Sequence, residues 1–92
     1  MKGLDSMMNV QNVNELRELL TLKNLKEKRY IHLTVGCDEM NYLEVFLSCF
    51  NNPNRTVVCC DVICDDEIIN NYYYYTVDEL VRQISIDWEL EE

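Results

Sequence analysis

The segment "NYLEVFLSCFNNPNRTVVCCDVIC", residues 41–64, decides the fold. Residues 38–50 suit a helix or a strand, because their apolar side chains recur at both helical and alternating spacing. Pro53 follows an asparagine, as in a type I turn, and the residues beyond it are rich in β-branched side chains. The segment therefore predicts an antiparallel hairpin that joins residues 42–50 to 55–64. The core-facing residues of its second strand are expected to be Val58, Cys60, Val62 and Cys64.

Capping signals mark the first residues of two helices. Asn12 and Thr76 are each followed three residues later by a glutamate, the spacing of a capping box, and each opens an apolar stripe at helical spacing. Between them, "RYIHLTVG", residues 29–36, alternates apolar and polar side chains and predicts a half-buried strand. Residues 71–75, four of which are tyrosines, predict another short strand just before the final helix.

The order of these elements predicts one α+β domain over residues 11–92, preceded by a flexible N-terminus over residues 1–10. An N-terminal helix leads into a three- to four-stranded antiparallel sheet, and a C-terminal helix follows. Both helices are expected on one face of the sheet. The opposite face, which carries His32, Glu44, Phe46 and some of the tyrosines, is expected to be exposed or covered by a partner.

Charge is divided unevenly along the chain. The 92 residues contain 17 acids and 8 bases, a net charge of −9. Residues 1–36 hold 6 bases and 4 acids, net +2, whereas residues 37–92 hold 2 bases and 13 acids, net −11, and the two parts sum to −9. Direct nucleic-acid binding requires a cationic surface that releases counterions from phosphates, so this composition excludes it. The expected partner is a basic nucleic-acid-binding protein.

The sequence shows no catalytic or metal-binding signature, and we expect neither an enzyme nor a cofactor. With 2 glycines and 1 histidine, it lacks a phosphate-binding loop and an oriented nucleophile–base pair. Its 5 cysteines are an odd number without C-x-x-C spacing, and His32 lies in a different segment, so free thiols are expected rather than zinc or disulfides. No apolar run is long enough to cross a membrane and no signal-peptide pattern is present, which predicts a cytoplasmic location.

Acids and tyrosines meet in "CDDEIINNYYYYT", residues 64–76. If Asp65 and Glu67 alternate along one strand, their side chains repeat every ~6.4–6.8 Å, a spacing similar to that of successive phosphates. Tyrosines supply rigid contact area that loses little entropy on binding. We therefore expect a surface on which acids steer a basic partner and tyrosines hold it. Its residues are Asp38, Glu39, Asp61, Asp65, Asp66, Glu67, Tyr72, Tyr73 and Tyr74.

A capped first helix ("NVNELRELL"), a strand ("RYIHLTVG"), an acidic centre ("CDVICDDEI") and an acidic last helix ("VDELVRQISIDWELEE") together resemble the small acidic anti-CRISPR proteins of phages that mimic DNA. The resemblance lies in architecture and charge. It implies a protein of the bacterial host cytoplasm that blocks the DNA-binding groove of a CRISPR effector nuclease, where the PAM is read. The resemblance places Asp61, Asp65, Asp66 and Glu67 at that interface.

Two alternatives stay open. A toxin-immunity or anti-restriction protein would present the same acids and tyrosines to another basic enzyme. A homodimeric structural or regulatory module would use the open sheet face for self-association. Salt dependence separates the two, because a charge-driven heterocomplex weakens as ionic strength rises, whereas an apolar dimer does not.

Overall fold

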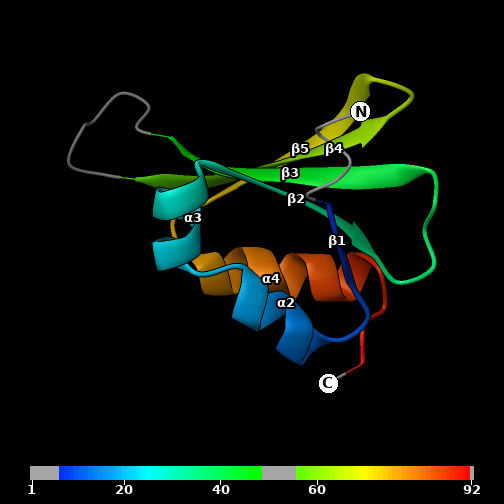
Figure 1. The fold of residues 1–92 in the computed structure, drawn as a ribbon, viewed down its shortest axis with the longest axis horizontal. Helices are drawn as coiled ribbons and strands as arrows, with labels where there is room; N and C mark the ends of the chain where they lie inside the picture. Colours follow the sequence, from blue (N-terminus) through cyan, green and yellow to red (C-terminus); the bar gives the residue numbers. More distant parts are fainter. Residues whose placement is uncertain (1–6, 49–55, 92) are drawn as a thin grey trace.

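Within residues 7–48 and 56–91, which this computed structural model describes, the chain forms one five-stranded sheet and three helices (Figure 1). The strands are β1 Met8–Val10, β2 Tyr30–Val35, β3 Asn41–Ser48, β4 Val57–Cys64 and β5 Glu67–Tyr74, and the helices are α2 Val13–Leu19, α3 Leu22–Lys28 and α4 Val77–Asp87. The strands lie in sequence order. β1 is parallel to β2, and the other neighbouring strands are antiparallel.

The protein is α+β, but the expectation of a three- to four-stranded antiparallel sheet after an N-terminal helix is wrong. The first described element is β1, which pairs in parallel with β2, with Val10 opposite Val35. Val10 is 2% exposed and belongs to the core, so the expectation of a flexible segment over residues 1–10 is wrong from Met8 onward. Residues 1–6 lie outside the described residues. A strand of 3 residues carries too little alternation to be recognised in a sequence.

The first predicted helix consists of two helices. α2 is capped by Asn12 as expected, since the Glu15 amide donates to the Asn12 side chain at 2.9 Å. Thr21 then interrupts the helical run, because its backbone is extended and its hydroxyl accepts from the Asn24 amide at 3.1 Å, which caps α3. The Asn24 side chain donates to the Leu19 carbonyl at 2.9 Å. Both short helices can therefore direct leucines into the core.

The predicted β3–β4 hairpin is confirmed where the structure describes it. The two strands pair over their whole length. Residues 38–50, which suited either a helix or a strand, form a strand from Asn41 to Ser48. Cys49 and the predicted turn at Pro53 lie outside the described residues.

A second hairpin joins β4 to β5 through Asp65 and Asp66. Both residues have positive φ, 52° and 64°, as in a two-residue type I′ turn. The register shifts once, at Ile69, which has no partner on β4 and forms a β-bulge. The strand that was predicted over residues 71–75 extends from Glu67 to Tyr74.

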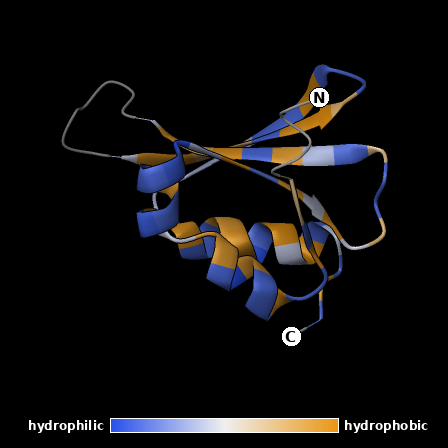
Figure 2. Cartoon of the chain, in the orientation of Figure 1, coloured by the Kyte–Doolittle hydropathy of each residue, from blue (hydrophilic) through white to orange (hydrophobic). Residues whose placement is uncertain are grey.

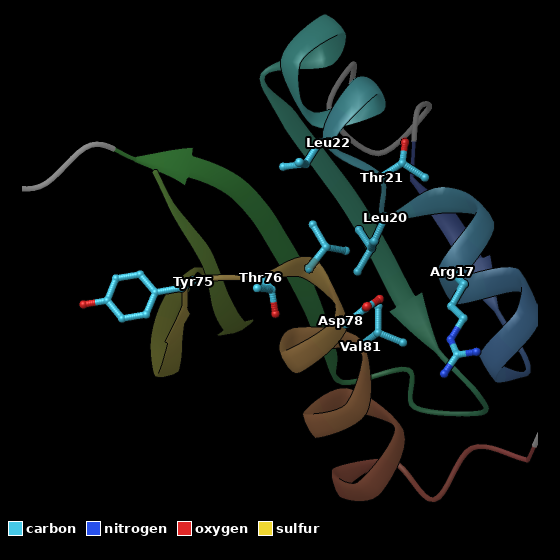
Figure 3. A pocket seen from close by; sticks show the side chains of 9 residues that line it. Arg17, Leu20, Thr21, Leu22, Tyr75, Thr76, Asp78 and Val81 are labelled. Carbon is cyan, nitrogen blue, oxygen red and sulfur yellow. The ribbon is translucent and has the colours of Figure 1, made fainter. Parts of the chain in front are cut away.

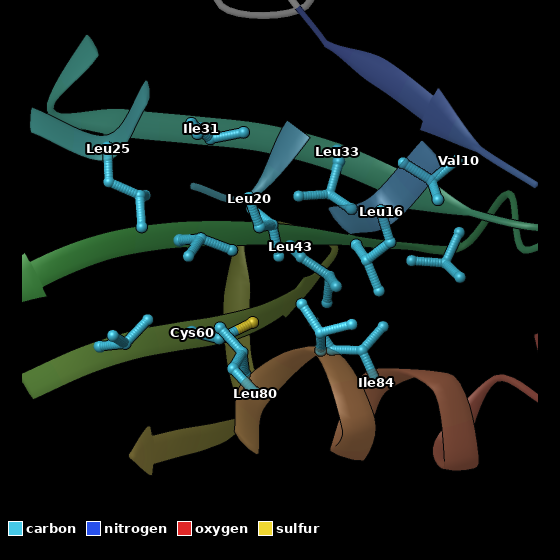
Figure 4. Close-up of a cluster of buried hydrophobic side chains, with 14 of the residues drawn as sticks. Val10, Leu16, Leu20, Leu25, Ile31, Leu33, Leu43, Cys60, Leu80 and Ile84 are labelled. Carbon is cyan, nitrogen blue, oxygen red and sulfur yellow. The ribbon is translucent and has the colours of Figure 1, made fainter. Parts of the chain in front are cut away.

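The described helices all cover the same face of the sheet (Figure 1). Apolar and polar residues alternate along the strands (Figure 2), and the apolar side chains of β2, β3 and β4 meet those of the helices in one core (Figure 4). In β4 the core residues are Val58, Cys60 and Val62, as predicted, each at most 4% exposed. The expectation that Cys64 also faces the core is wrong, because this residue is half-buried beside the turn and lies outside the core cluster.

Helix α4 begins at its predicted cap. The Thr76 hydroxyl accepts from the Glu79 amide at 3.2 Å and donates to the Glu79 carboxylate at 2.9 Å. Leu80, Val81 and Ile84 are buried in the core. In the part of the chain that the structure describes, no helix has the length and apolar character needed to cross a bilayer.

The segment after α4 returns to the start of α2. Glu91 forms a parallel bridge with Asn12, and its carbonyl accepts from the amide of Val13 at 2.9 Å. Two segments that are far apart in the sequence therefore meet on the helix side of the domain.

Candidate interaction surface

The face of the sheet opposite the helices carries its own set of outward side chains, which we call the open face. Strand alternation places them there, because their neighbours in the sequence point into the core. The pairing register arranges them in rows that cross β2 to β5. The open face consists of Tyr30, His32, Tyr42, Glu44, Phe46, Val57, Cys59, Asp61, Ile63, Ile68, Asn71 and Tyr73.

Aromatic rings form a connected group on β2 and β3. The centroid of the Tyr30 ring lies 5.7 Å from that of Phe46 and 6.5 Å from that of His32. The His32 centroid lies 6.1 Å from that of Tyr42, in an edge-on arrangement. These separations fall in the range of about 4.5–7 Å that is favourable for ring pairs. Tyr30 is 52% exposed, so part of the group is open to a partner.

Three apolar side chains of β4 are buried on this face although no described helix covers them. Val57, Cys59 and Ile63 are only 9%, 1% and 8% exposed. Cys59 lies between two large neighbours, Phe46 on β3 and Tyr73 on β5. The large side chains of the open face therefore shield a thin apolar layer of their own.

The middle row of the open face is polar. His32, Glu44, Asp61 and Asn71 lie opposite one another on four consecutive strands. The His32 Nε2 and Glu44 Oε2 atoms are 2.9 Å apart, and the two side chains are 26% and 29% exposed. Burial, and then the neighbouring Glu44 carboxylate, raise the pKa of Asp61, which forms no hydrogen bond or ion pair with the described residues. Two carboxylates therefore share a partly buried row with one imidazole.

The predicted interface tyrosines divide between the two faces of the sheet. The Tyr72 hydroxyl donates to Asp87 at 2.5 Å and the Tyr74 hydroxyl donates to Gln83 at 3.3 Å, so both rings lie on the helix side. Burial, and secondly the Asp87 hydrogen bond, raise the pKa of Tyr72. Tyr73 belongs to the open face and is 53% exposed. Tyr72 and Tyr74 therefore do not belong to the open face, and their assignment to a partner-binding surface stays a prediction.

Most of the predicted acids gather at one end of the sheet, where β2 connects to β3 and β4 turns into β5 (Figure 1). The four exposed residues Glu39, Asp65, Asp66 and Glu67 are called the acidic end below. The expectation that Asp65 and Glu67 alternate along one strand is wrong, because Asp65 lies in the turn and only Glu67 belongs to β5. Asp61 lies apart from them, in the middle of the open face.

Asp38 has a structural role rather than a free carboxylate. It accepts hydrogen bonds from Trp88 Nε1 at 2.9 Å, from the Asn41 side chain at 2.9 Å, and from the amides of Met40 and Asn41 at 3.0 and 3.1 Å. Burial is the largest single influence and acts to raise its pKa, but the hydrogen bonds from Trp88, Asn41 and Met40 together leave the pKa lowered. Asp38 therefore ties the β2–β3 connection to the end of α4, and its prediction as a partner-binding residue does not fit this geometry.

The end of α4 extends the negative charge of the acidic end. Helix α4 ends at Asp87, on the same side of the molecule as the β4–β5 turn (Figure 1), and its last turn contains no base. Glu89 and Glu91 follow in the sequence. Helix C-termini favour positive charge, so these acids oppose the helix dipole. In contrast, α3 ends with Lys26 and Lys28 at the opposite end of the molecule. The separation of charge in space is incomplete, because the exposed acids Asp78 and Glu79 lie in the first turn of α4, on the same side of the molecule as α3 (Figure 1).

His32 and Glu44 do not assemble with the Cys59 thiol, the nucleophile of the open face among the described residues. His32 on β2 is separated by β3 from Cys59 on β4, and two strand spacings amount to about 9.6 Å. Burial, and then the charge of Asp61, raise the pKa of the Cys59 thiol, which is the opposite of activation. Among residues 7–48 and 56–91, no group of three or more His, Cys, Asp or Glu side chains is placed to hold a metal ion.

A groove of about 470 Å³ lies on the helix side, between the α2–α3 junction and the start of α4 (Figure 3). Leucine and valine side chains form much of its wall, and Arg17 and Asp78 flank it. The hydroxyls that line it, those of Thr21 and Thr76, already cap α3 and α4. The groove therefore lacks the set of convergent, unused polar groups that orients a small molecule in a binding site.

The sequence prediction of site residues overlaps with the open face only at Asp61 and Tyr73. It omitted Tyr30 and Tyr42, which form the aromatic group with His32 and Phe46. The signal that could have found them is alternation: in "RYIHLTVG" and "NYLEVF" every second side chain must point away from the core.

The comparisons with known proteins assign no family to the chain. No family model, no curated protein and no solved structure matches it significantly.

Proposed function

We propose that this protein is a small acidic inhibitor that binds a basic nucleic-acid-binding protein and occupies its nucleic-acid site by charge mimicry. The observation that carries the proposal is the separation of charge. Residues 37–92 have a net charge of −11, and four of their exposed acids, Glu39, Asp65, Asp66 and Glu67, form the acidic end, whereas exposed Asp78 and Glu79 lie apart in the first turn of α4. A basic nucleic-acid groove complements such a surface, and electrostatic steering accelerates its association.

Local conformation supports the view that these acids serve binding rather than folding. Asp65 and Asp66 occupy positive-φ positions that asparagine and glycine adopt more readily. At each of these positions a different residue would suit the local structure better.

A CRISPR effector nuclease is the first target that we propose, because the chain resembles DNA-mimicking anti-CRISPR proteins in its charge. The acidic end would lie in the groove that reads the PAM, where arginine side chains contact DNA. Restriction nucleases and nuclease toxins are further targets of the same chemical class. In this proposal the protein acts by binding alone and in the bacterial cytoplasm.

The turn offers a clean test of this proposal. The double substitution D65N/D66G removes two charges and creates the preferred sequence of a type I′ turn, so the variant should be at least as stable as the parent protein. The matched control E18Q/E27Q removes two exposed acids from α2 and α3, away from the acidic end.

Binding should be measured by biolayer interferometry against purified CRISPR effectors, restriction nucleases and nuclease toxins, with and without duplex DNA and at increasing salt. We expect one class to bind, with DNA competing and salt weakening the complex. The D65N/D66G variant should bind about tenfold more weakly, since a complementary charge pair contributes about 1 kcal/mol or more, whereas E18Q/E27Q should bind like the parent. Absence of binding to every class, or binding indifferent to DNA and salt, would contradict the proposal.

A further inference from the structure

The open face combines two kinds of groups that seldom occur together on an uncovered sheet. Aromatic rings of Tyr30, Tyr42 and Phe46 surround part of its middle, and the carboxylates of Glu44 and Asp61 lie in the middle row. On β3, Glu44 stands between Tyr42 and Phe46 on the same face, because alternate residues of a strand point to the same side. Any ligand of this surface contacts rings and negative charge at the same time.

The charge of the middle row decides which ligands fit. Exposed rings on a sheet can stack on unpaired bases, but phosphates would then approach Glu44 and Asp61 and be repelled. A second copy of the chain would bring the same two carboxylates into opposition with their own counterparts, and each copy carries a net charge of −9. A cationic side chain satisfies both the rings and the acids.

We propose that the open face binds an arginine side chain of the basic partner, with its guanidinium group above the Glu44 and Asp61 carboxylates and its plane against the neighbouring aromatic rings. This inference rests on the proposed function for the nature of the partner and adds a second, more specific contact to the acidic end. Arginine fits better than lysine, because the planar guanidinium stacks on rings and donates in a fork to carboxylates, whereas ammonium is a compact, strongly hydrated charge.

The surroundings of Asp61 favour the binding of a cation. Glu44 already has a partner in His32 at 2.9 Å, but Asp61 has none among the described residues, although it is partly buried beside that second carboxylate. Burial and the Glu44 charge both raise the pKa of Asp61. A guanidinium group placed between them would relieve the repulsion and supply the missing hydrogen bonds.

The test uses the full chain labelled for NMR and three blocked pentapeptides, Gly-Gly-X-Gly-Gly, in which X is arginine, citrulline or lysine. Citrulline has the shape of arginine without its charge. We expect the arginine peptide to shift the amide signals of the open-face strands, including those of His32, Asp61 and Asn71, with lysine weaker and citrulline without effect. The Asp61→Asn variant should bind the arginine peptide about tenfold more weakly, as expected for the loss of a charge-assisted hydrogen bond. The control Asp78→Asn, on the helix side, should bind it like the parent.

Three results would overturn the inference. Equal chemical-shift changes with the citrulline peptide would show that binding does not depend on the positive charge. Changes confined to Glu39 and Asp65–Glu67 would show that the arginine peptide binds only at the acidic end. Self-association in sedimentation equilibrium that is lost in Tyr30→Ala, together with no arginine binding, would assign the open face to a second copy.

The test is separable from that of the proposed function. If arginine peptides bind the open face but no nuclease binds the protein, the inhibitor proposal fails and this one stands. If a nuclease binds with a loss in D65N/D66G but with unchanged affinity for Asp61→Asn, the inhibitor proposal stands and this one fails.

Discussion

Both faces of the sheet bury apolar side chains of β4, but these side chains are covered in different ways. On the helix side, β4 places Val58, Cys60 and Val62 under α2, α3 and α4. On the open side, its residues Cys59 and Ile63 are nearly as buried, yet among the described residues no helix covers them and their neighbours lie on the adjoining strands. Burial alone therefore does not separate a structural face from a binding face. The separating feature is the cover, because backbone elements are fixed while side chains can rearrange around a partner.

Polar groups show the same contrast. On and beside the helix side, Asp38 accepts side-chain hydrogen bonds from Asn41 and Trp88, and Asp87 accepts them from Tyr72 and Gln83. On the open side, Glu44 has one partner and Asp61 has none among the described residues. The first pair is used inside the fold, whereas the second pair is available to an incoming donor. The substitutions below test this contrast, beginning with the largest expected change.

The largest difference should appear between Leu33→Ala and Tyr30→Ala, two substitutions on the same strand. Leu33 is 0% exposed under the helices, and its truncation should lower the free energy of unfolding by about 2–5 kcal/mol. Tyr30 is 52% exposed, and its truncation should lower this free energy by less than about 1 kcal/mol. Urea denaturation followed by circular dichroism measures both values. Equal losses would mean that the open face is a second structural core.

The next effect concerns the hydrogen bonds of Asp38. Trp88→Phe removes the indole donor and should lower the free energy of unfolding by about 1–3 kcal/mol at neutral pH. The pKa of Asp38 is lowered from its ordinary value of 3.8 in the folded protein. Its charged form therefore contributes stability that is present above pH 3.8 and is lost as the pH falls through the lowered pKa.

The pH dependence supplies the control for Asp38. The parent protein should lose stability as the pH falls below about 4, and this loss should be smaller in Asp38→Asn, which has no carboxylate to protonate. Thermal unfolding at a series of pH values measures the difference. An unchanged acid profile in Asp38→Asn would show that the Trp88 contact is not formed in solution.

A smaller effect separates two tyrosines. Tyr72→Phe deletes the hydroxyl that donates to Asp87 on the helix side and should lower the free energy of unfolding by about 0.5–1.5 kcal/mol. Tyr30→Phe deletes an exposed hydroxyl on the open face and should change it by less than about 0.5 kcal/mol. The hydroxyl titration of Tyr72, followed by ultraviolet absorbance, should also lie above the ordinary range, because burial and Asp87 raise its pKa. A Tyr72 that titrates with the exposed tyrosines would contradict its inward placement.

The smallest effect has the opposite sign. Asp61→Asn should raise the free energy of unfolding slightly, by up to about 0.5 kcal/mol at neutral pH, because it removes a carboxylate that burial and Glu44 disfavour. Since the pKa of Asp61 is raised in the folded state, the parent protein should gain stability as the pH falls through that pKa, and the variant should lack this gain. A destabilised Asp61→Asn protein would indicate that the carboxylate has a structural partner.

The features that were predictable from the sequence are those fixed by neighbouring residues. The caps at Asn12 and Thr76 and the β3–β4 hairpin each depend on a few positions with a defined chemistry. The split at Thr21 belongs to the same class, because a threonine hydroxyl that caps the next helix is a local signal, but the leucine periodicity on both sides conceals it.

The features that were not predictable depend on contacts between distant segments. Strand β1 forms because Val10 and its neighbours pair with β2. Asp38 accepts a hydrogen bond from Trp88, which lies 50 residues away in the sequence. The direction of each tyrosine on β5 depends on the register with β4 and on the bulge at Ile69. No local sequence pattern indicates these long-range contacts. The sequence analysis therefore placed the acids and tyrosines on one surface, whereas the structure distributes them over both faces of the sheet and one of its ends.

The bridge between Asn12 and Glu91 bears on how the chain folds during its synthesis. The amide of Val13 donates to the Glu91 carbonyl, so the start of α2 lacks this acceptor until the C-terminal segment has been made. On the ribosome, the sheet from β2 to β5 can form from neighbouring hairpins before α4 has emerged. The helix layer can close only afterwards, and until then the apolar side of the sheet is a site at which chaperones would bind the nascent chain.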